Sequence, residues 1–469
     1  MVQPPPKESK GEIRQFKLKG HSAPVLCLAH SSSSFKSNKS CIEPSCLLSG
    51  SEDGTARLWD LRCSTRASIC IISPKVLDEQ GKEEDRDVNS VAFHPLQEKG
   101  ANLNNGISKN FTVYTAVGKH VYGYDLRLAS SPILKEPTFD LSSTVGSKDE
   151  INVMAFSHLK KKNSKIHLAV ADDYGDVRVT DLAPYSDADK RLHSLQGKKT
   201  TSHLEKNEMN HSCNQRLCRV LEHDKDGYTL ATSCAFRPHR NLEIASAGTD
   251  CTINIWDISK PRRPCSMYTV QRDDSGTNQM CNPPIIHSLS WSPSGYLLAA
   301  GLGDGGVMVL AMKGRKLVEA CRLRQGHTSA VACVLFPLFE HRKINESSLH
   351  VTSNDRMLIS AGNDGAILLW DLKRNVAGDH AVDPATLFHG CDHPSPKKNN
   401  SVNTNIDHVA TEAIKNLSLT SMEPKILFGI PHQLKPNFLA CSQDSNTLPV
   451  TLFVADTSCE ITAYSLPLL

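Results

Sequence analysis

The sequence predicts an all-β fold, a seven-bladed β-propeller closed by its N-terminal strand with polar insertions, and two observations lead to it. First, a short pattern of Ser, Asp-Gly and Trp-Asp recurs at fixed spacing along the 469 residues, so the chain is built from repeats. Second, each unit contains short runs of alternating apolar and polar residues bounded by turn residues, which is the periodicity of β-strands. Units of four such strands are the blades of a propeller.

Three copies of the pattern are strong. They read SGSEDGTARLWDLR at 49–62, SAGTDCTINIWDIS at 246–259 and SAGNDGAILLWDLK at 360–373. In each copy Ser precedes Asp by four residues, and Asp precedes Trp by six. A Gly-His pair stands upstream of the first and third copies. The Asp-Gly dipeptide within the pattern predicts a tight hairpin between two strands of the blade.

Weaker copies bring the number of units to seven and lie at 88–127, 151–182, 285–310 and 451–466. Seven units of about 40 to 45 residues need about 300 residues, so roughly a third of the chain is insertion. The last unit is one strand short, and residues 13–18 form a spare strand before the first Gly-His. We expect this strand to complete the last blade, because closure removes two open sheet edges.

Each strong copy carries residue types that can form one buried hydrogen-bond chain, in which Asp accepts from His and Ser bridges to the indole N–H of Trp. The predicted sets are His21/Ser49/Asp53/Trp59, His223/Ser246/Asp250/Trp256 and His327/Ser360/Asp364/Trp370. A buried polar chain survives only when every member is satisfied, and it then fixes the register of its blade. Asp, His and Ser could also form a hydrolase triad. Because the set recurs three times, each time with Trp, we interpret these residues as structural.

Composition excludes several classes of function. The formal net charge is +3, from 53 basic and 50 acidic residues, so no direct binding of nucleic acid is expected. No apolar run approaches the roughly 18 residues of a membrane helix, and the N-terminal MVQPPPKESKGE has no apolar core typical of a signal peptide. We therefore expect a soluble intracellular protein, in the nucleus, the cytoplasm or both, whose 16 cysteines are reduced.

The predicted organisation is a disordered N-terminus, 1–12, followed by a single propeller domain, 13–469. Two long polar segments, 184–217 and 375–424, interrupt the ring; they are poor in aromatic residues and rich in Lys, Asn, Ser and His, so we expect them to be mobile. A group of possible zinc ligands comprises His203, His211, Cys213, Cys218 and His223. None of its spacings is C-x-x-C, so we expect no zinc site and no other cofactor. The sequence also contains no phosphate-binding loop and no nucleophile elbow, which argues against an enzyme.

One residue of the pattern, Arg62, has no structural explanation. The other strong copies carry Ser259 and Lys373 there, so the fold does not demand Arg. The second unit ends in YDLR, so two consecutive blades present the pairs Asp60/Arg62 and Asp125/Arg127 where the third strand ends. A guanidinium is a planar five-donor fork suited to carboxylates or carbonyls of a partner. The alternative is that each Arg pairs with the Asp of its own blade.

The units resemble WD repeats, and tandem W-D-x-R or Y-D-x-R blades resemble those of WD-repeat receptors that dock on the damaged-DNA-binding adaptor of cullin-4 ubiquitin ligases. CAFRPHRNLEIASAGTDCTINIWDIS and LFVADTSCEITAYSL are similar to segments of the WD repeat-containing protein 53 family. The resemblance runs from about 18 to 466 and fails in the insertions. It implies a monomeric, non-catalytic substrate receptor that binds the adaptor through one face and recruits an unidentified protein substrate through another.

Two other classes of function stay open at this level. A general scaffold of another complex would keep its partners when Arg62 and Arg127 are replaced, because the fold supports many functions. A reader of histone tails needs an acidic or aromatic cage at the channel mouth, for which Glu52, Asp172 and Asp173 are the available loop residues. An enzymatic propeller is disfavoured, because the strands that line the channel, such as VNSVAF and INVMAF, are mainly apolar.

Overall fold

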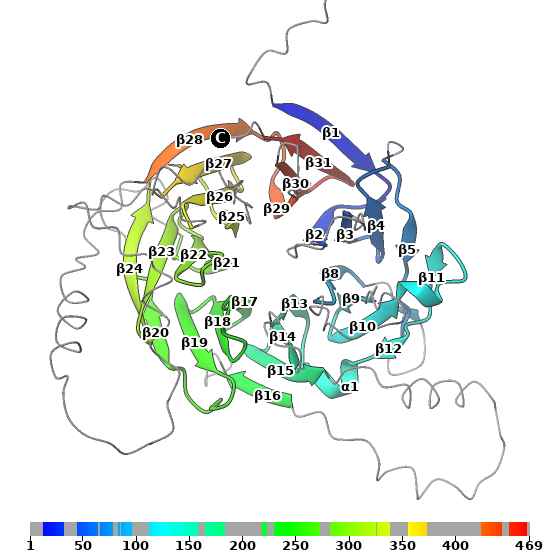
Figure 1. Cartoon of the computed structure of the whole chain (residues 1–469), viewed down its shortest axis with the longest axis horizontal. Coiled ribbons are helices and arrows are strands. Elements are labelled where there is room, and N and C mark those ends of the chain that lie inside the picture. Colours follow the sequence, from blue (N-terminus) through cyan, green and yellow to red (C-terminus); the bar gives the residue numbers. More distant parts are fainter. Residues whose placement is uncertain are drawn as a thin grey trace, which may run out of the picture.

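The computed structural model of the chain is a closed ring of seven antiparallel sheets, which confirms the predicted all-β propeller (Figure 1). The structure describes residues 13–31, 45–63, 66–77, 83–84, 86–95, 112–157, 165–182, 218–222, 229–272, 282–324, 326–337, 355–372, 424–442 and 450–466. The predicted disordered N-terminus, the insertion 184–217 and nearly all of the insertion 375–424 lie outside these residues.

In each of the first six blades the chain runs from the innermost strand outward. The first three blades contain β2 (Val25–His30), β3 (Cys46–Ser51), β4 (Ala56–Asp60) and β5 (Cys70–Ile72); β8 (Val88–Phe93), β9 (Thr112–Val117), β10 (His120–Asp125) and β12 (Phe139–Asp140); and β13 (Ile151–Phe156), β14 (Ile166–Asp172), β15 (Asp176–Leu182) and β16 (Cys218–Glu222). The next three contain β17 (Ala231–Phe236), β18 (Glu243–Gly248), β19 (Thr252–Asp257) and β20 (Ser266–Thr269); β21 (Ile286–Trp291), β22 (Leu297–Leu302), β23 (Val307–Lys313) and β24 (Lys316–Leu323); and β25 (Val331–Leu335), β26 (Met357–Gly362), β27 (Ala366–Asp371) and β28 (Lys425–Pro431).

The seventh blade joins the two ends of the described chain, as predicted. It contains β29 (Pro436–Ser442), β30 (Thr451–Asp456), β31 (Glu460–Ser465) and, as its outermost strand, β1 (Arg14–Lys19). β1 runs antiparallel to β31 in an unbroken register, and Lys17 and Lys19 both pair with Glu460 at 2.8 Å. The ring is therefore closed by hydrogen bonds between segments more than 400 residues apart in the sequence.

The core lies between the blades rather than inside any one of them. One apolar cluster joins Trp59 of the first blade to Leu18 and Phe453 of the seventh, and comparable clusters join the other neighbours. Alternation along each strand gives a blade two apolar faces, and each face packs against a different neighbour. Because every blade is supported on both sides, the ends of the third strands occupy fixed places on one face of the ring.

One short strand pairs with a neighbouring blade instead of its own. β11 (Ile133–Leu134) belongs to the connection between β10 and β12 of the second blade, yet it pairs in parallel with β5 on the outer edge of the first blade (Figure 1). The amides of Ile71 and Ser73 donate to the carbonyls of Pro132 and Leu134, each at 2.8 Å. The first two blades are thus joined by backbone hydrogen bonds as well as by side-chain packing.

Candidate protein-interaction site

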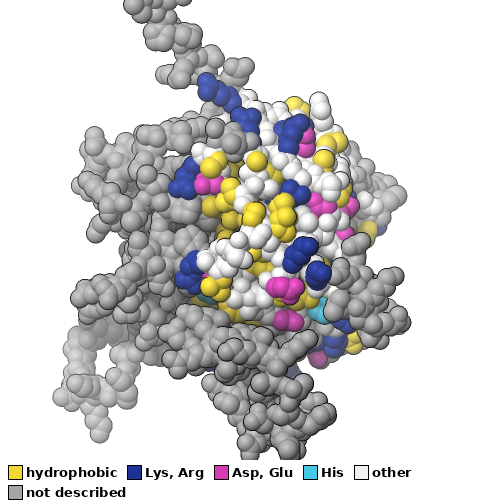
Figure 2. All heavy atoms as spheres, turned by 90° about the vertical axis from the view of Figure 1, so that its right-hand side faces the viewer, with side chains coloured by type: hydrophobic (Ala, Val, Ile, Leu, Met, Phe, Trp, Pro, Cys, Tyr) yellow, Lys and Arg dark blue, Asp and Glu magenta, His cyan; other side chains and the backbone are white. Residues whose placement is uncertain are grey.

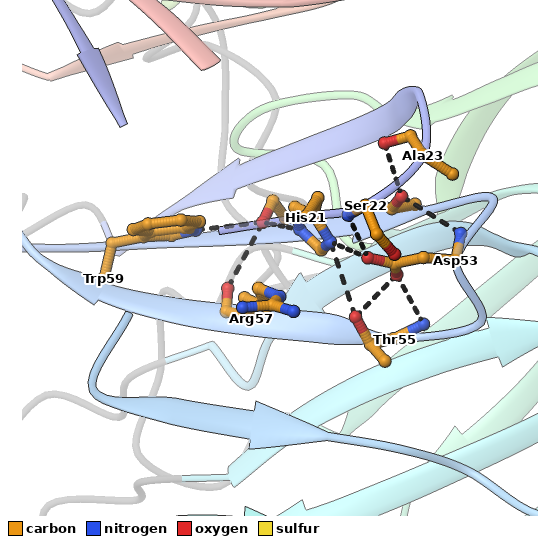
Figure 3. Close-up of polar contacts among 9 residues, drawn as sticks. His21, Ser22, Ala23, Asp53, Thr55, Arg57 and Trp59 are labelled. Atoms are coloured by element: carbon orange, nitrogen blue, oxygen red, sulfur yellow. Dashed lines mark hydrogen bonds and ion pairs between the residues drawn. The ribbon is translucent and has the colours of Figure 1, made fainter. Parts of the chain in front are cut away.

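The hydrogen-bond chain of the first blade links four predicted residues in a line (Figure 3). His21 Nδ1 lies 2.9 Å from Asp53 Oδ2, and His21 Nε2 lies 2.8 Å from Ser49 Oγ. The indole Nε1 of Trp59 donates to the same Ser49 Oγ at 2.9 Å. Asp53 also accepts from the amide of Thr55, which stabilises the turn at Gly54, where φ is +71°. The side chains of His21, Ser49 and Trp59 are buried, so the hydroxyl of Ser49 is not accessible to solvent.

The sixth blade repeats the arrangement. His327 Nδ1 lies 3.2 Å from Asp364, His327 Nε2 lies 2.7 Å from Ser360 Oγ, and the indole of Trp370 donates to Ser360 at 2.8 Å. Burial alone would raise the pKa of Asp364. Hydrogen bonds from His327 and from two backbone amides outweigh that effect and lower the pKa to about 2.

The set of the fourth blade is described in part. The indole of Trp256 donates to Ser246 Oγ at 2.8 Å, and Asp250 accepts from the amide of Thr252 at 3.0 Å. His223, the fourth predicted member, lies outside the described residues.

The two Asp-x-Arg motifs have the same local geometry. Arg62 donates to the Asp60 carboxylate through Nε at 2.9 Å and through Nη2 at 2.6 Å. Arg127 donates to Asp125 through the same two atoms at the same two distances. In each motif the amide of the Arg also donates to the Asp at 3.0 Å, which closes a tight turn at the end of the third strand.

These bonds resolve the two interpretations of the arginines only in part. Each Arg does pair with the Asp of its own blade, yet the Arg62 and Arg127 side chains remain 47% and 44% exposed. The pair uses two of the five N–H groups of the guanidinium, so three remain for a partner. The hydrogen bonds lower the pKa of Asp60 and raise that of Arg127, so both motifs stay ionised and carry little net charge.

A third Arg–Asp fork, which the Asp-x-Arg motif does not predict, lies in the sixth blade. Arg356 donates to both carboxylate oxygens of Asp371, the Asp that follows Trp370. The two partners are 15 residues apart and meet because the β26–β27 hairpin pairs Met357 with Asp371. The pairing of Arg356 with Asp371 could be found only from the register of the hairpin, because the two residues do not form a sequence motif. This fork has no Arg two residues after its Asp, so it offers a control for the other two.

Exposed apolar side chains lie near the two Asp-x-Arg motifs. Ile69 precedes β5 and is 46% exposed, Leu128 follows Arg127 and is 67% exposed, and Ile133 in β11 is 47% exposed. Figure 2 views the side of the ring that holds β5 and β11, and hydrophobic side chains gather there with Lys and Arg around them. We call the surface formed by Ile69, Leu128 and Ile133 the blade 1–2 seam.

The mouth of the channel is built for closure of the ring. Each innermost strand contains a β-bulge at its second residue. Three of these residues donate a hydrogen bond to a carbonyl of the next blade: Asn437 to Val25 at 2.9 Å, Asn152 to Ala231 at 3.0 Å, and Thr232 to Ile286. Because these three bulged residues form hydrogen bonds to the neighbouring blade, their side chains serve a structural role.

The residues considered for a histone cage are placed differently from one another. Glu52 is exposed in a turn, whereas Asp172 is fully buried and accepts from Ser147 and from the amide of Asp176. Asp173 accepts from Asn152 at 2.7 Å. Asp172 is therefore unable to line an open cage.

Two further findings concern the described residues alone. No helix in that part of the chain is long and apolar enough to cross a membrane. Nor does that part contain a group of three or more His, Cys, Asp and Glu side chains placed to hold a metal ion. Of the zinc ligands considered above, only Cys218 is among those residues.

Comparison with known proteins agrees with the ring. Four segments, 13–60, 215–257, 279–309 and 319–371, match the family described as WD domain, G-beta repeat. WD repeats of this family therefore recur along the chain, and the matched segments include the stretch from Ser to Trp-Asp in all three strong copies of the motif. Among curated proteins it is similar to the WD repeat-containing protein 53 homolog of Dictyostelium discoideum, with 25% identity over 89% of this chain and 91% of that protein. It is also similar to the ribosome biogenesis protein WDR12 homolog of Trichoplax adhaerens, with 23% identity over 72% of this chain and 63% of that protein.

Proposed function

We propose that this chain is a substrate receptor that docks on the damaged-DNA-binding adaptor of cullin-4 RING ubiquitin ligases through Asp60/Arg62 and Asp125/Arg127. The observation that carries the proposal is the identical fork in two adjacent blades. WD-repeat propellers generally serve as protein-interaction scaffolds and are typically not catalytic. The receptor would act in the nucleus, the cytoplasm or both, as a monomer within the complex, without direct contact to nucleic acid.

The geometry of the forks favours binding over a purely structural role. Arg is flexible, and fixing it on binding costs conformational entropy. Here each guanidinium is already held by its own Asp, so less entropy is lost when a partner docks. As stabilising contacts the forks contribute little, since exposed ion pairs contribute about 0–1 kcal/mol. Two preorganised arginines on one face of the ring are therefore better explained by a partner.

A second candidate is a scaffold of another nuclear or cytoplasmic complex. It is favoured by the similarity to the WDR12 homolog, whose name places that protein in ribosome biogenesis. On this view the partner need not be the adaptor, and Arg62 and Arg127 need not contribute to binding.

Co-purification of the adaptor with the full chain separates the two. We expect wild type to capture the adaptor and Arg62→Ala/Arg127→Ala to lose it. Arg356→Ala is the matched control, because it breaks a fork of the same kind in the sixth blade and should leave capture unchanged. Melting curves should show that all three proteins are folded.

The other outcomes argue against the proposal. Failure of the wild-type chain to capture the adaptor would reject the ligase role and favour the second candidate. Equal capture by wild type and the double variant would show that the arginines do not mediate docking.

A further inference from the structure

The connection that contains β11 links the second Asp-x-Arg motif to the outer strand of the first blade, the blade that carries the first motif. The chain leaves Arg127, passes Leu128 and reaches Pro132, whose carbonyl accepts from Ile71 of the first blade. Five residues span at most about 18 Å, so the second motif lies within that distance of the outer strand of the first blade. The first motif ends β4, which is the strand that pairs with β5.

The pairing also determines which side chains face outward. Ile133 stands opposite Ile71 in the parallel register, and Ile69 lies two residues before Ile71. Successive side chains alternate between the faces of a sheet, so Ile69, Ile71 and Ile133 share one face. Leu134 is on the other face and packs against the core between the first two blades. The pairing of β11 with β5 therefore fixes the exposed side chain of Ile133 on the outer edge of the first blade.

From this arrangement we infer that the adaptor docks on the blade 1–2 seam as a continuous surface, with Ile69, Leu128 and Ile133 as its apolar part and Arg62 and Arg127 as its polar part. The inference rests on the proposed function and adds the chemistry of the partner. Exposed apolar side chains next to hydrogen-bond donors mark interaction sites.

The charge of the seam indicates what the partner presents. Each guanidinium is already neutralised by a carboxylate 2.6 Å away, so an additional acidic group gains little attraction. The remaining N–H groups suit carbonyl oxygens. We infer that the partner surface consists of apolar side chains flanked by carbonyl oxygens, rather than of acidic residues. Binding of this kind responds weakly to salt.

The test measures the affinity of the purified adaptor for the full chain at 0.1 M and 0.5 M salt. Leu128→Ser/Ile133→Ser should bind at least about tenfold more weakly than wild type. The matched control is Leu242→Ser/Met267→Ser in the fourth blade, where the exposures are 47% and 64%, close to the 47% of Ile133 and the 67% of Leu128. It should bind within about twofold of wild type, whose affinity should change less than about threefold with salt.

The results distinguish the inference from the function on which it rests. If Arg62→Ala/Arg127→Ala loses the adaptor but Leu128→Ser/Ile133→Ser binds like wild type, the apolar seam is rejected and the ligase role stands. If wild type does not bind the adaptor, both are rejected. A loss of more than about tenfold in wild-type affinity between the two salt concentrations would overturn the inferred partner chemistry. Unfolding curves of both Ser variants must match wild type for a loss of binding to support the seam.

Discussion

Replacing Ser49 by Ala tests whether the buried hydrogen-bond chain fixes the first blade. Ser49 Oγ lies 2.8 Å from His21 Nε2 and accepts from the Trp59 indole at 2.9 Å. Ser49→Ala would leave both nitrogen atoms buried without a partner. A buried polar group that loses its partner costs about 1–3 kcal/mol, so for the two groups together we expect the free energy of unfolding to fall by about 2–6 kcal/mol.

The second blade supplies the contrasting variant. Thr115 occupies the place of Ser49 in its blade, because each pairs with the fourth residue of its innermost strand, Val91 and Leu28 respectively. Thr115 Oγ1 and the hydroxyl of Tyr124 are buried and have no hydrogen-bond partner among the described residues. Thr115→Val removes an unsatisfied group, so we expect a change within about 1 kcal/mol, in either direction.

Urea unfolding followed by tryptophan fluorescence measures both effects. The chain has four tryptophans, and Trp59 reports directly on the first blade. A lower midpoint with an unchanged slope means a change in stability alone. A cost below about 1 kcal/mol for Ser49→Ala, or an equal cost for the two variants, would refute the assigned role of the hydrogen-bond chain.

Three further predictions concern the backbone, pH and thiol reactivity. Gly175 has φ +87°, and a Cβ added there would lie 2.3 Å from a carbonyl oxygen of the next blade, so Gly175→Ala should lower the free energy of unfolding in urea by more than about 2 kcal/mol. Gly314 has φ +63° and open space around it, so Gly314→Ala should cost about 1 kcal/mol. Equal costs for the two variants would contradict this reasoning. Burial lowers the pKa of His94 to about 4, so the unfolded chain binds the proton first and stability falls as pH drops from 6.5 towards 4. His94→Gln should reduce that slope in urea unfolding by up to about 1.4 kcal/mol per pH unit, and an unchanged slope would show that His94 is not responsible. Burial raises the pKa of the Cys234 thiol to about 12, whereas Cys63 is exposed. Mass spectrometry after alkylation of the native protein at pH 8 should therefore find Cys63 modified well before Cys234. Equal rates of modification would contradict the burial of Cys234.

The sequence contained enough local information to predict the ring, because register and closure depend on patterns within each unit. The spacing from Ser49 to Trp59 is fixed by one hairpin, so the hydrogen bond between them could be anticipated. The spare strand before the first Gly-His likewise indicated its pairing with the last unit. Such features are local, or follow from the need to leave no open edge.

Features that depend on contacts between blades were not predictable. β11 consists of only two residues, and nothing in its local pattern shows that it pairs with β5 of another blade. The fork of Arg356 and Asp371 depends on the register of a hairpin rather than on a motif. For Arg62 the sequence left open whether its own Asp or a partner is the acceptor, and only side-chain geometry shows that Asp60 is an acceptor while the arginine stays half exposed.

The most direct test of the account is a photo-crosslink from the seam to the adaptor. A benzophenone amino acid at position 128, next to Arg127, would report contact with any protein within a few ångströms. Position 242, in the fourth blade, has an exposed Leu and is the control. We predict a crosslink between the adaptor and position 128 and none from position 242. A wild-type complex that forms without a crosslink from position 128, or with equal crosslinks from both positions, would contradict docking on the blade 1–2 seam.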